Sequence, residues 1–261
     1  MMDASSNDQA RALNNQPRAF DKRPQALKPP EALMRAIVQD LRPVKPSPQP
    51  FHLALRMVLP ALVISSLILL AIGLRYDSGI LGPLLTWGAS AAQFVLAIAL
   101  VWIAAHESMP AGRLPRQMIY SLALAAFLVV VCISLVTWSI SPVREPLLRV
   151  PPFINEKLRD SPWIMGLGCG VGSTVAGGIL VLLFSRMFRS SLATRPTIAG
   201  ALYGAGAGLA INAGWRIACP VSTLWHALGA HGAAIIATAM LGALIGHLLG
   251  RRRLEAGAGR A

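Results

Sequence analysis

The feature that most constrains this chain is a series of six uncharged apolar stretches. They run over Met57–Leu74, Leu84–Ala105, Met118–Trp138, Trp163–Phe184, Pro196–Trp215 and Ala227–Leu249. Each is close to the roughly 18–25 residues that a helix needs to cross a hydrocarbon core of about 30 Å. Because lipid offers no hydrogen-bond partners to the backbone, such stretches must be helices and not open strands. The sequence therefore predicts an all-α membrane protein with six transmembrane helices.

The basic residues are divided unevenly between the two sides of these predicted helices. A net charge of +13 first suggests a nucleic-acid partner, but 18 of the 24 Lys and Arg residues fall on the side that holds both termini. The positive-inside rule places that side in the cytoplasm. The basic residues are not interleaved with aromatic ones as on a nucleic-acid surface. The charge therefore indicates topology, and we predict no direct contact with nucleic acid.

The composition divides the chain into four parts. Residues 1–28 are polar, carry charges of both signs and are predicted to form a disordered cytoplasmic tail. Residues 29–56 combine a short helix, bounded by prolines on both sides, with a proline-rich spacer. Residues 57–249 form the predicted transmembrane domain. Residues 250–261 form a basic cytoplasmic tail.

The short helix is amphipathic. At 100° per residue its apolar side chains fall within an arc of about 140°, and they are Leu33, Met34, Ile37, Val38 and Leu41. Such a face fits either a groove on a partner protein or the membrane surface. The polar face is less basic than that of a typical interfacial helix, so we predict a protein partner.

The apolar stretches offer little for transport or catalysis. They hold few polar groups, among them Asn212, which is expected to form a hydrogen bond between helices. Ser173, in a glycine-rich run, would need a histidine facing it to act as a nucleophile, and no acyl-transfer turn is present. Glycines at four-residue spacing indicate close helix packing, within one bundle or in a homo-oligomer. We predict that the protein is not an enzyme.

Two of the three cysteines are predicted to share one side of the membrane. Alternating topology places Cys169 near the non-cytoplasmic end of the fourth stretch and Cys219 just beyond that end of the fifth. His226 and His231, at the start of the sixth, are the nearest imidazoles. These groups could form a disulfide or bind a transient soft-metal ion. The alternative is that the cysteines are small buried apolar residues, as we expect for Cys132.

Three segments together resemble a known family. They are LMRAIVQDLRPVKPSPQP before the first stretch, Cys169 in the fourth, and GWRIACPVSTLWHALG between the fifth and sixth. In order and placement they resemble the negative regulator of sigma-F family, six-span anti-sigma factors of the bacterial inner membrane. The resemblance implies that the cytoplasmic tail holds an extracytoplasmic-function sigma factor.

The resemblance also implies that Cys169 and Cys219 receive a redox or heavy-metal signal. Relatives tend to carry acidic residues after the Cys-Pro pair, where this chain has Val221, Ser222 and Thr223. This difference argues against a carboxylate ligand at that position. The competing interpretations are a small permease and a structural subunit of a membrane complex.

Overall fold

The computed structural model describes residues 49–107, 114–141, 162–188 and 195–258, together with Pro30, Glu31 and Arg35. The chain separates into two units, residues 1–46 and 47–261. In the first unit, Arg35 forms an exposed ion pair of 3.3 Å with Glu31. The predicted partner-binding face (Leu33, Met34, Ile37, Val38 and Leu41) lies outside the described residues.

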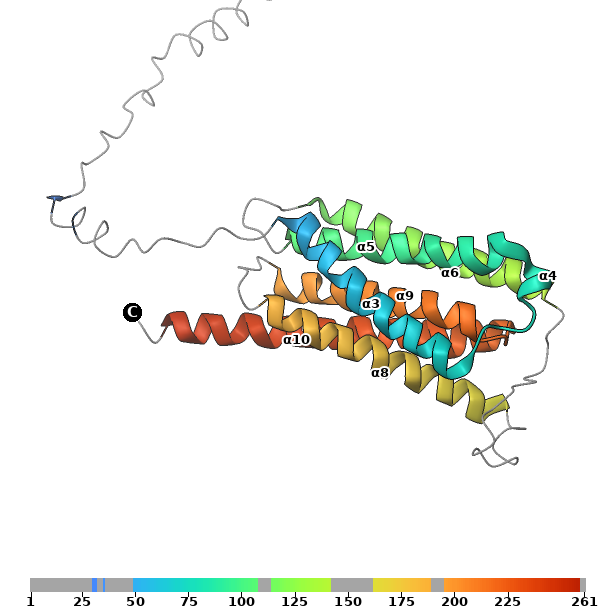
Figure 1. The fold of residues 1–261 in the computed structure, drawn as a ribbon. Helices are drawn as coiled ribbons and strands as arrows, with labels where there is room; N and C mark the ends of the chain where they lie inside the picture. The colour runs from blue at the N-terminus through green and yellow to red at the C-terminus, as the bar shows by residue number, and fades with distance from the viewer. Residues whose placement is uncertain are drawn as a thin grey trace, which may run out of the picture. The chain divides into compact units, whose positions relative to one another are not determined.

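The described part of the second unit contains six long helical segments and no β-strand (Figure 1). Two of these segments are composite: α4, η1 and α5 form one, and η2 and α10 form another. The helices are α3 (Pro50–Ile72), α4 (Ser78–Pro83), η1 (Leu84–Gly88), α5 (Ala89–Glu107), α6 (Arg116–Ile140), α8 (Pro162–Phe188), α9 (Pro196–Ala218), η2 (Trp225–Gly232) and α10 (Ala233–Ala258). The segments η1 and η2 are π-helices that continue directly into α5 and α10. The prediction of an all-α protein is confirmed for the described residues.

Five of the six predicted spans correspond to helices that are long and apolar enough to cross a membrane. These five are Pro50–Ile72, Ser78–Glu107, Arg116–Ile140, Gly166–Arg186 and Trp225–Arg252. The sixth predicted span corresponds to α9, a helix of 23 residues that is not among the five. More than half of its residues are Gly or Ala, which are less apolar than the Leu, Ile and Val of the others.

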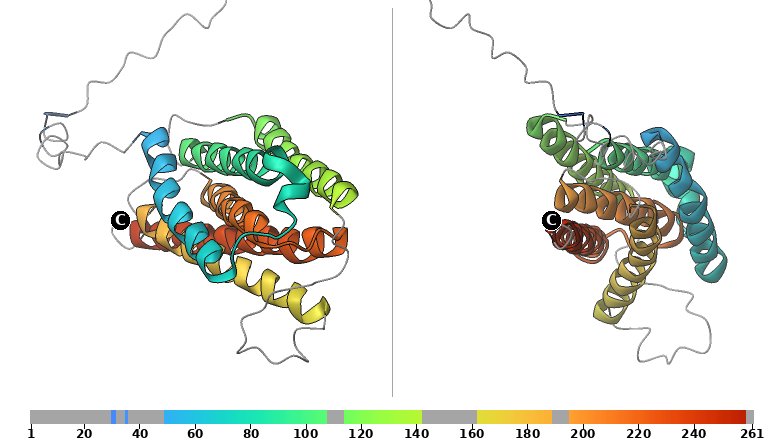
Figure 2. Two further views of the ribbon diagram at one scale, coloured as in Figure 1. Left: turned by 45° about the vertical axis from the view of Figure 1, so that its right-hand side comes forward. Right: turned by 90° about the vertical axis from the view of Figure 1, so that its left-hand side faces the viewer.

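The position of α9 explains its composition. It lies among the other helices (Figure 2) and packs against α3, α5, α8 and α10. Most of its side chains are buried. A helix enclosed by other helices needs small residues for close approach more than it needs apolar residues to face lipid. A Cβ atom added to Gly200 would collide with the carbonyl oxygen of Gly242, and one added to Gly204 with that of Thr238. The glycine rows of α9 and α10 therefore meet each other inside the bundle.

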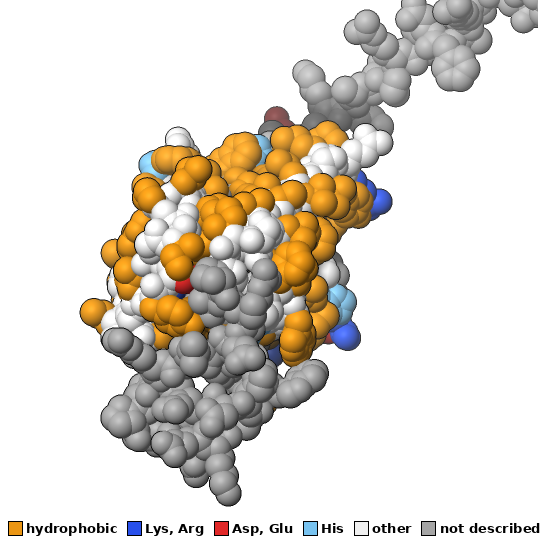
Figure 3. All heavy atoms as spheres, turned by 90° about the vertical axis from the view of Figure 1, so that its right-hand side faces the viewer, with side chains coloured by type: hydrophobic (Ala, Val, Ile, Leu, Met, Phe, Trp, Pro, Cys, Tyr) orange, Lys and Arg blue, Asp and Glu red, His pale blue; other side chains and the backbone are white. Residues whose placement is uncertain are grey.

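The outer surface of the bundle is apolar. Large hydrophobic side chains are exposed on α3, α6, α8 and α10, with Leu70 82% exposed. Figure 3, which views the bundle from one end, shows many hydrophobic and few charged side chains on the described part of that face. An exposed apolar belt of this extent is typical of a surface that faces lipid. We conclude that this is a membrane protein.

Polar contacts mark the two ends of the bundle. At one end, which we call the Cys219 end, the carboxylate of Asp77 accepts a 2.7 Å hydrogen bond from Ser141. At the other, which we call the Arg195 end, Glu107 is completely buried and lies 3.4 Å from Arg195. Helix α9 connects them, because Arg195 precedes its first residue and Cys219 follows its last.

Candidate thiol and imidazole site

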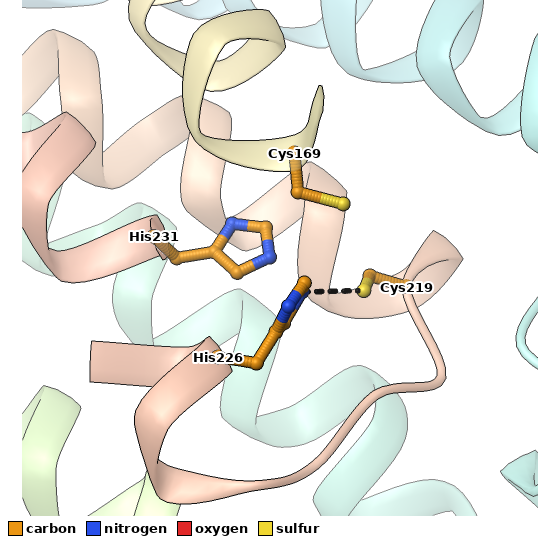
Figure 4. Close-up of side chains that lie close together, drawn as sticks. All are labelled: Cys169, Cys219, His226 and His231. Atoms are coloured by element: carbon orange, nitrogen blue, oxygen red, sulfur yellow. Dashed lines mark hydrogen bonds between the residues drawn. The ribbon is translucent and has the colours of Figure 1, made fainter. Parts of the chain in front are cut away.

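Two thiols and two imidazoles converge at the Cys219 end. Cys169 comes from α8, Cys219 directly follows α9, and His226 and His231 both come from η2 (Figure 4). The two sulfur atoms and one ring nitrogen from each histidine all lie within 4.8 Å of one another, and all four residues are buried. These are the four residues that the sequence placed on one side of the membrane. Cys132 is exposed on α6.

The π-helical form of η2 puts both histidines on one face. In an α-helix, residues five apart point about 140° away from each other. The wider turn of a π-helix, with its i→i+5 hydrogen bonding, instead brings them much closer to the same face. The rings of His226 and His231 accordingly lie 5.1 Å apart, at an angle of 70°. Sequence reasoning assumed a regular helix here, so it grouped the histidines by proximity along the chain alone.

Short contacts orient the donor atoms. The sulfur of Cys219 lies 3.3 Å from Nε2 of His226. On the far side of the cluster, the hydroxyl of Ser173 lies 3.4 Å from Nδ1 of His231. This contact occupies Nδ1 and leaves Nε2 of His231 to face the thiols. A hydrogen-bond partner on the second ring nitrogen commonly holds a metal-binding histidine in one tautomer and orientation.

Ser173 thus has the facing histidine that a nucleophilic serine would require. Among the described residues, however, no carboxylate pairs with His231 to orient it as a base. The serine also lies within the continuous helix α8 and not on a strained turn. The geometry fits a residue that positions His231.

Arg75 is a structural residue that sequence reasoning missed. It lies between α3 and α4, after Gly73, whose φ of 90° favours glycine. Its guanidinium binds both carboxylate oxygens of Asp77, at 2.6 and 2.8 Å, and both residues are buried. The sequence signal for this ion pair was the presence of two opposite charges, two residues apart, in a short loop. It was missed because the positive-inside rule uses Arg75 only as one of many positive charges.

The same guanidinium fixes the backbone on both sides of Cys219. It donates to the carbonyl oxygen of Arg216 at 3.2 Å and to that of Pro220 at 3.3 Å. It also donates to the hydroxyl of Ser222 at 2.8 Å. Ser222, which follows the Cys-Pro pair by two residues, therefore binds Arg75. Arg75 holds the segment that presents Cys219 to the cluster.

The Arg75–Asp77 pair shifts the titration of the carboxylate. Burial acts to raise the pKa of Asp77, but hydrogen bonds from Arg75 and Ser141 outweigh it and hold this pKa below its ordinary value. The carboxylate is therefore charged at neutral pH and balances Arg75.

A second polar contact crosses the interior of the bundle. The side-chain amide of Asn212, on α9, donates a 3.1 Å hydrogen bond to the side-chain oxygen of Gln93, on α5. This confirms the predicted interhelical role of Asn212. The pair lies beside the cluster, because both residues line a small cavity that also touches Cys219 and His231.

The fold and the site define a class: a helical membrane protein with a buried cluster of two thiols and two imidazoles at one end. The sequence profile of a family described as negative regulator of sigma F matches residues 37–251. The chain therefore belongs to this family, as the resemblance indicated, and its family role is negative regulation of a sigma factor. No curated protein and no solved structure matches the chain.

Proposed function

We propose that this protein is an anti-sigma factor of the bacterial inner membrane. Both termini lie in the cytoplasm, and the helix at residues 31–42 binds an extracytoplasmic-function sigma factor. Oxidation of Cys169 and Cys219, or binding of a heavy-metal ion to them, releases the sigma factor. The observation that supports the sensing role is the convergence of four buried donor atoms within 4.8 Å, from α8, from η2 and from the residue that follows α9.

The donor set suits a soft or borderline metal ion. Two cysteine sulfurs with two imidazole nitrogens are typical ligands of tetrahedral d¹⁰ ions. In such a complex, donor atoms lie about 3.3–3.8 Å apart, because the metal–sulfur distance is about 2.3 Å and the metal–nitrogen distance about 2.0 Å. The atoms here are spread over up to 4.8 Å. Binding would therefore draw α8, the end of α9 and η2 toward one another.

An oxidant would use the same thiols differently. A two-electron oxidant accepts two electrons from the thiols, both S–H protons leave, and one sulfur–sulfur bond forms between Cys169 and Cys219. The histidines take no part in this reaction. Either signal contracts the cluster. The two signals are distinguished by their dependence on His226 and His231.

Contraction at the Cys219 end can reach the opposite end through α9. To change a partner from about 99% bound to 1% bound, the signal must favour the releasing state by roughly 5.5 kcal/mol. Two metal–thiolate bonds or a disulfide are of that order. At its other end α9 begins after Arg195, which contacts Glu107 and the carbonyl oxygen of Leu114. Because α3 begins close to that end (Figure 1), a shift of α9 would act near the point where the tail joins the membrane domain.

The test is capture and release of the sigma factor by the full chain in membranes. The double variant Cys169→Ser with Cys219→Ser should retain the sigma factor but not release it on treatment with cadmium or a thiol oxidant. Cys132→Ser, the matched control, should release it normally. Continued release by the double variant would refute the sensing role.

The proposed binding of the sigma factor by the helix at residues 31–42 is tested separately. Leu33→Asp with Ile37→Asp should abolish capture, whereas Arg35→Gln, on the polar face, should leave it unchanged. Unchanged capture by the double aspartate variant would place the sigma-binding surface elsewhere.

A further inference from the structure

A polar cavity of about 40 Å³ adjoins the thiol and imidazole cluster. Its lining includes Arg75, Arg216, Gln93 and Asn212, and it shares Cys219 and His231 with the cluster. A cavity needs a volume of roughly 10–15 Å³ to hold one water molecule. The space is therefore sufficient for about three waters or one small polyatomic ion.

The charges around the cavity do not balance. Arg75 and Arg216 both line it, and the carboxylate of Asp77 is bound to Arg75 through two hydrogen bonds. Arg216 forms no ion pair with any described residue. The C-terminal end of α9 contributes only about half a negative charge. The half-buried guanidinium of Arg216 therefore remains largely uncompensated at the end of α9, where partial removal from water makes an unpaired charge costly.

The hydrogen bonds of Arg216 are also incomplete. Its Nη2 atom donates to Thr137 at 2.5 Å and to the carbonyl oxygen of Leu85 at 3.1 Å. Its Nε atom is buried and has no acceptor among the described residues. A buried N–H group without a partner costs free energy comparable to a lost hydrogen bond. A negatively charged acceptor would both balance the charge of Arg216 and accept a hydrogen bond from its Nε–H group.

We propose that this cavity is a binding site for a small inorganic anion, of the size of a halide or nitrate, with Arg216 as its principal partner. The net positive charge of the lining repels a cation, and a water molecule would leave that charge unbalanced. A planar oxyanion can accept charge-assisted hydrogen bonds from a guanidinium. The anion would lie beside Cys219 and shield its sulfur from small reagents. The site does not depend on the sensor function.

The test measures thermal unfolding of the full chain in detergent, with sodium nitrate, sodium bromide or sodium gluconate at equal ionic strength. Gluconate is too large for the cavity. Nitrate and bromide should raise the unfolding midpoint saturably, by about 3–6 °C at ten times the dissociation constant. They should also slow modification of Cys219 by methyl methanethiosulfonate. Equal midpoints in all three salts would overturn the proposal and indicate a water-filled cavity.

Variants separate binding at this cavity from general salt effects. Arg216→Gln should lose the nitrate effect, and Arg216→Lys should retain part of it. Arg252→Gln, which changes an exposed arginine, should retain all of it. Retention by Arg216→Gln would refute the site. If Arg216→Gln does not fold, crystals of the natural protein in bromide decide: an anomalous peak in the cavity supports the site, and its absence overturns it.

Discussion

The sulfur of Cys219 lies 3.3 Å from Nε2 of His226, seven residues further along the chain. A loop and the first turn of a π-helix separate them, and the contact closes this segment on itself. Because the nitrogen faces the sulfur directly, an ion bound by one is within reach of the other.

Replacement of this histidine should separate the two kinds of signal. His226→Gln removes one of four donors, so we expect the affinity for cadmium to fall at least about tenfold, with oxidant-driven disulfide formation unchanged. Cadmium–thiolate absorbance and non-reducing mass spectrometry measure the two outcomes. His247→Gln, remote from the cluster, is the control. A matching loss of oxidation in His226→Gln would contradict the assignment.

Ser173 should act through His231. Ser173→Ala removes the hydroxyl on Nδ1, and loss of such an orienting group typically weakens metal binding about 10–100-fold. Ser173→Thr, which keeps a hydroxyl, should recover most of the affinity. Thr174→Ala is the control, because the hydroxyl of Thr174 bonds to its own helix, at the carbonyl oxygen of Gly170. A metal titration of each variant gives the result, and equal affinities would show that Ser173 is only a packing residue.

The Arg75–Asp77 pair should be essential for stability. Arg75→Gln leaves a buried carboxylate without its cation, which typically costs about 3–5 kcal/mol. Asp77→Asn should cost a similar amount, and the double variant less than the sum, because no charge is then left unpaired. Chemical unfolding in detergent measures these free energies. Additive losses would mean that the pair does not act as a unit.

The lowered pKa of Asp77 gives stability a defined pH dependence. In the unfolded chain this carboxyl titrates near about 3.9. A folded-state pKa below that value contributes stability that is fully present above about pH 4 and is lost as pH falls through the folded pKa. The stability difference between the natural chain and Asp77→Asn should therefore shrink below about pH 4. A difference that stays constant down to about pH 2 would contradict this prediction.

Close packing of α9 on α10 should make one glycine intolerant of any side chain. Gly204→Ala places a methyl group against the backbone of α10, and such overpacking costs about 1–3 kcal/mol or more. Gly168→Ala, on α8, meets no atom within 4 Å and should be tolerated. Thermal unfolding compares the two, and equal midpoints would show that the helices separate easily.

The sequence by itself determined the helical class of the protein, most of its membrane-spanning segments and the shared end at which Cys169 and Cys219 lie. These features follow from local composition and from counting spans, because lipid allows few backbone solutions. The polarity of Asn212 within an apolar stretch likewise predicted that it joins two helices. The pattern did not show that α9 is enclosed by the others, since glycine spacing alone does not say which helix meets which.

Only the tertiary structure decided how the site is built. The alignment of His226 with His231 depends on a π-helix, and the position of Cys219 depends on hydrogen bonds from Arg75, more than 140 residues earlier in the chain. The first is a local departure from the helical period that pattern analysis assumes. The second is a long-range contact between loops, and no periodicity in the sequence encodes it.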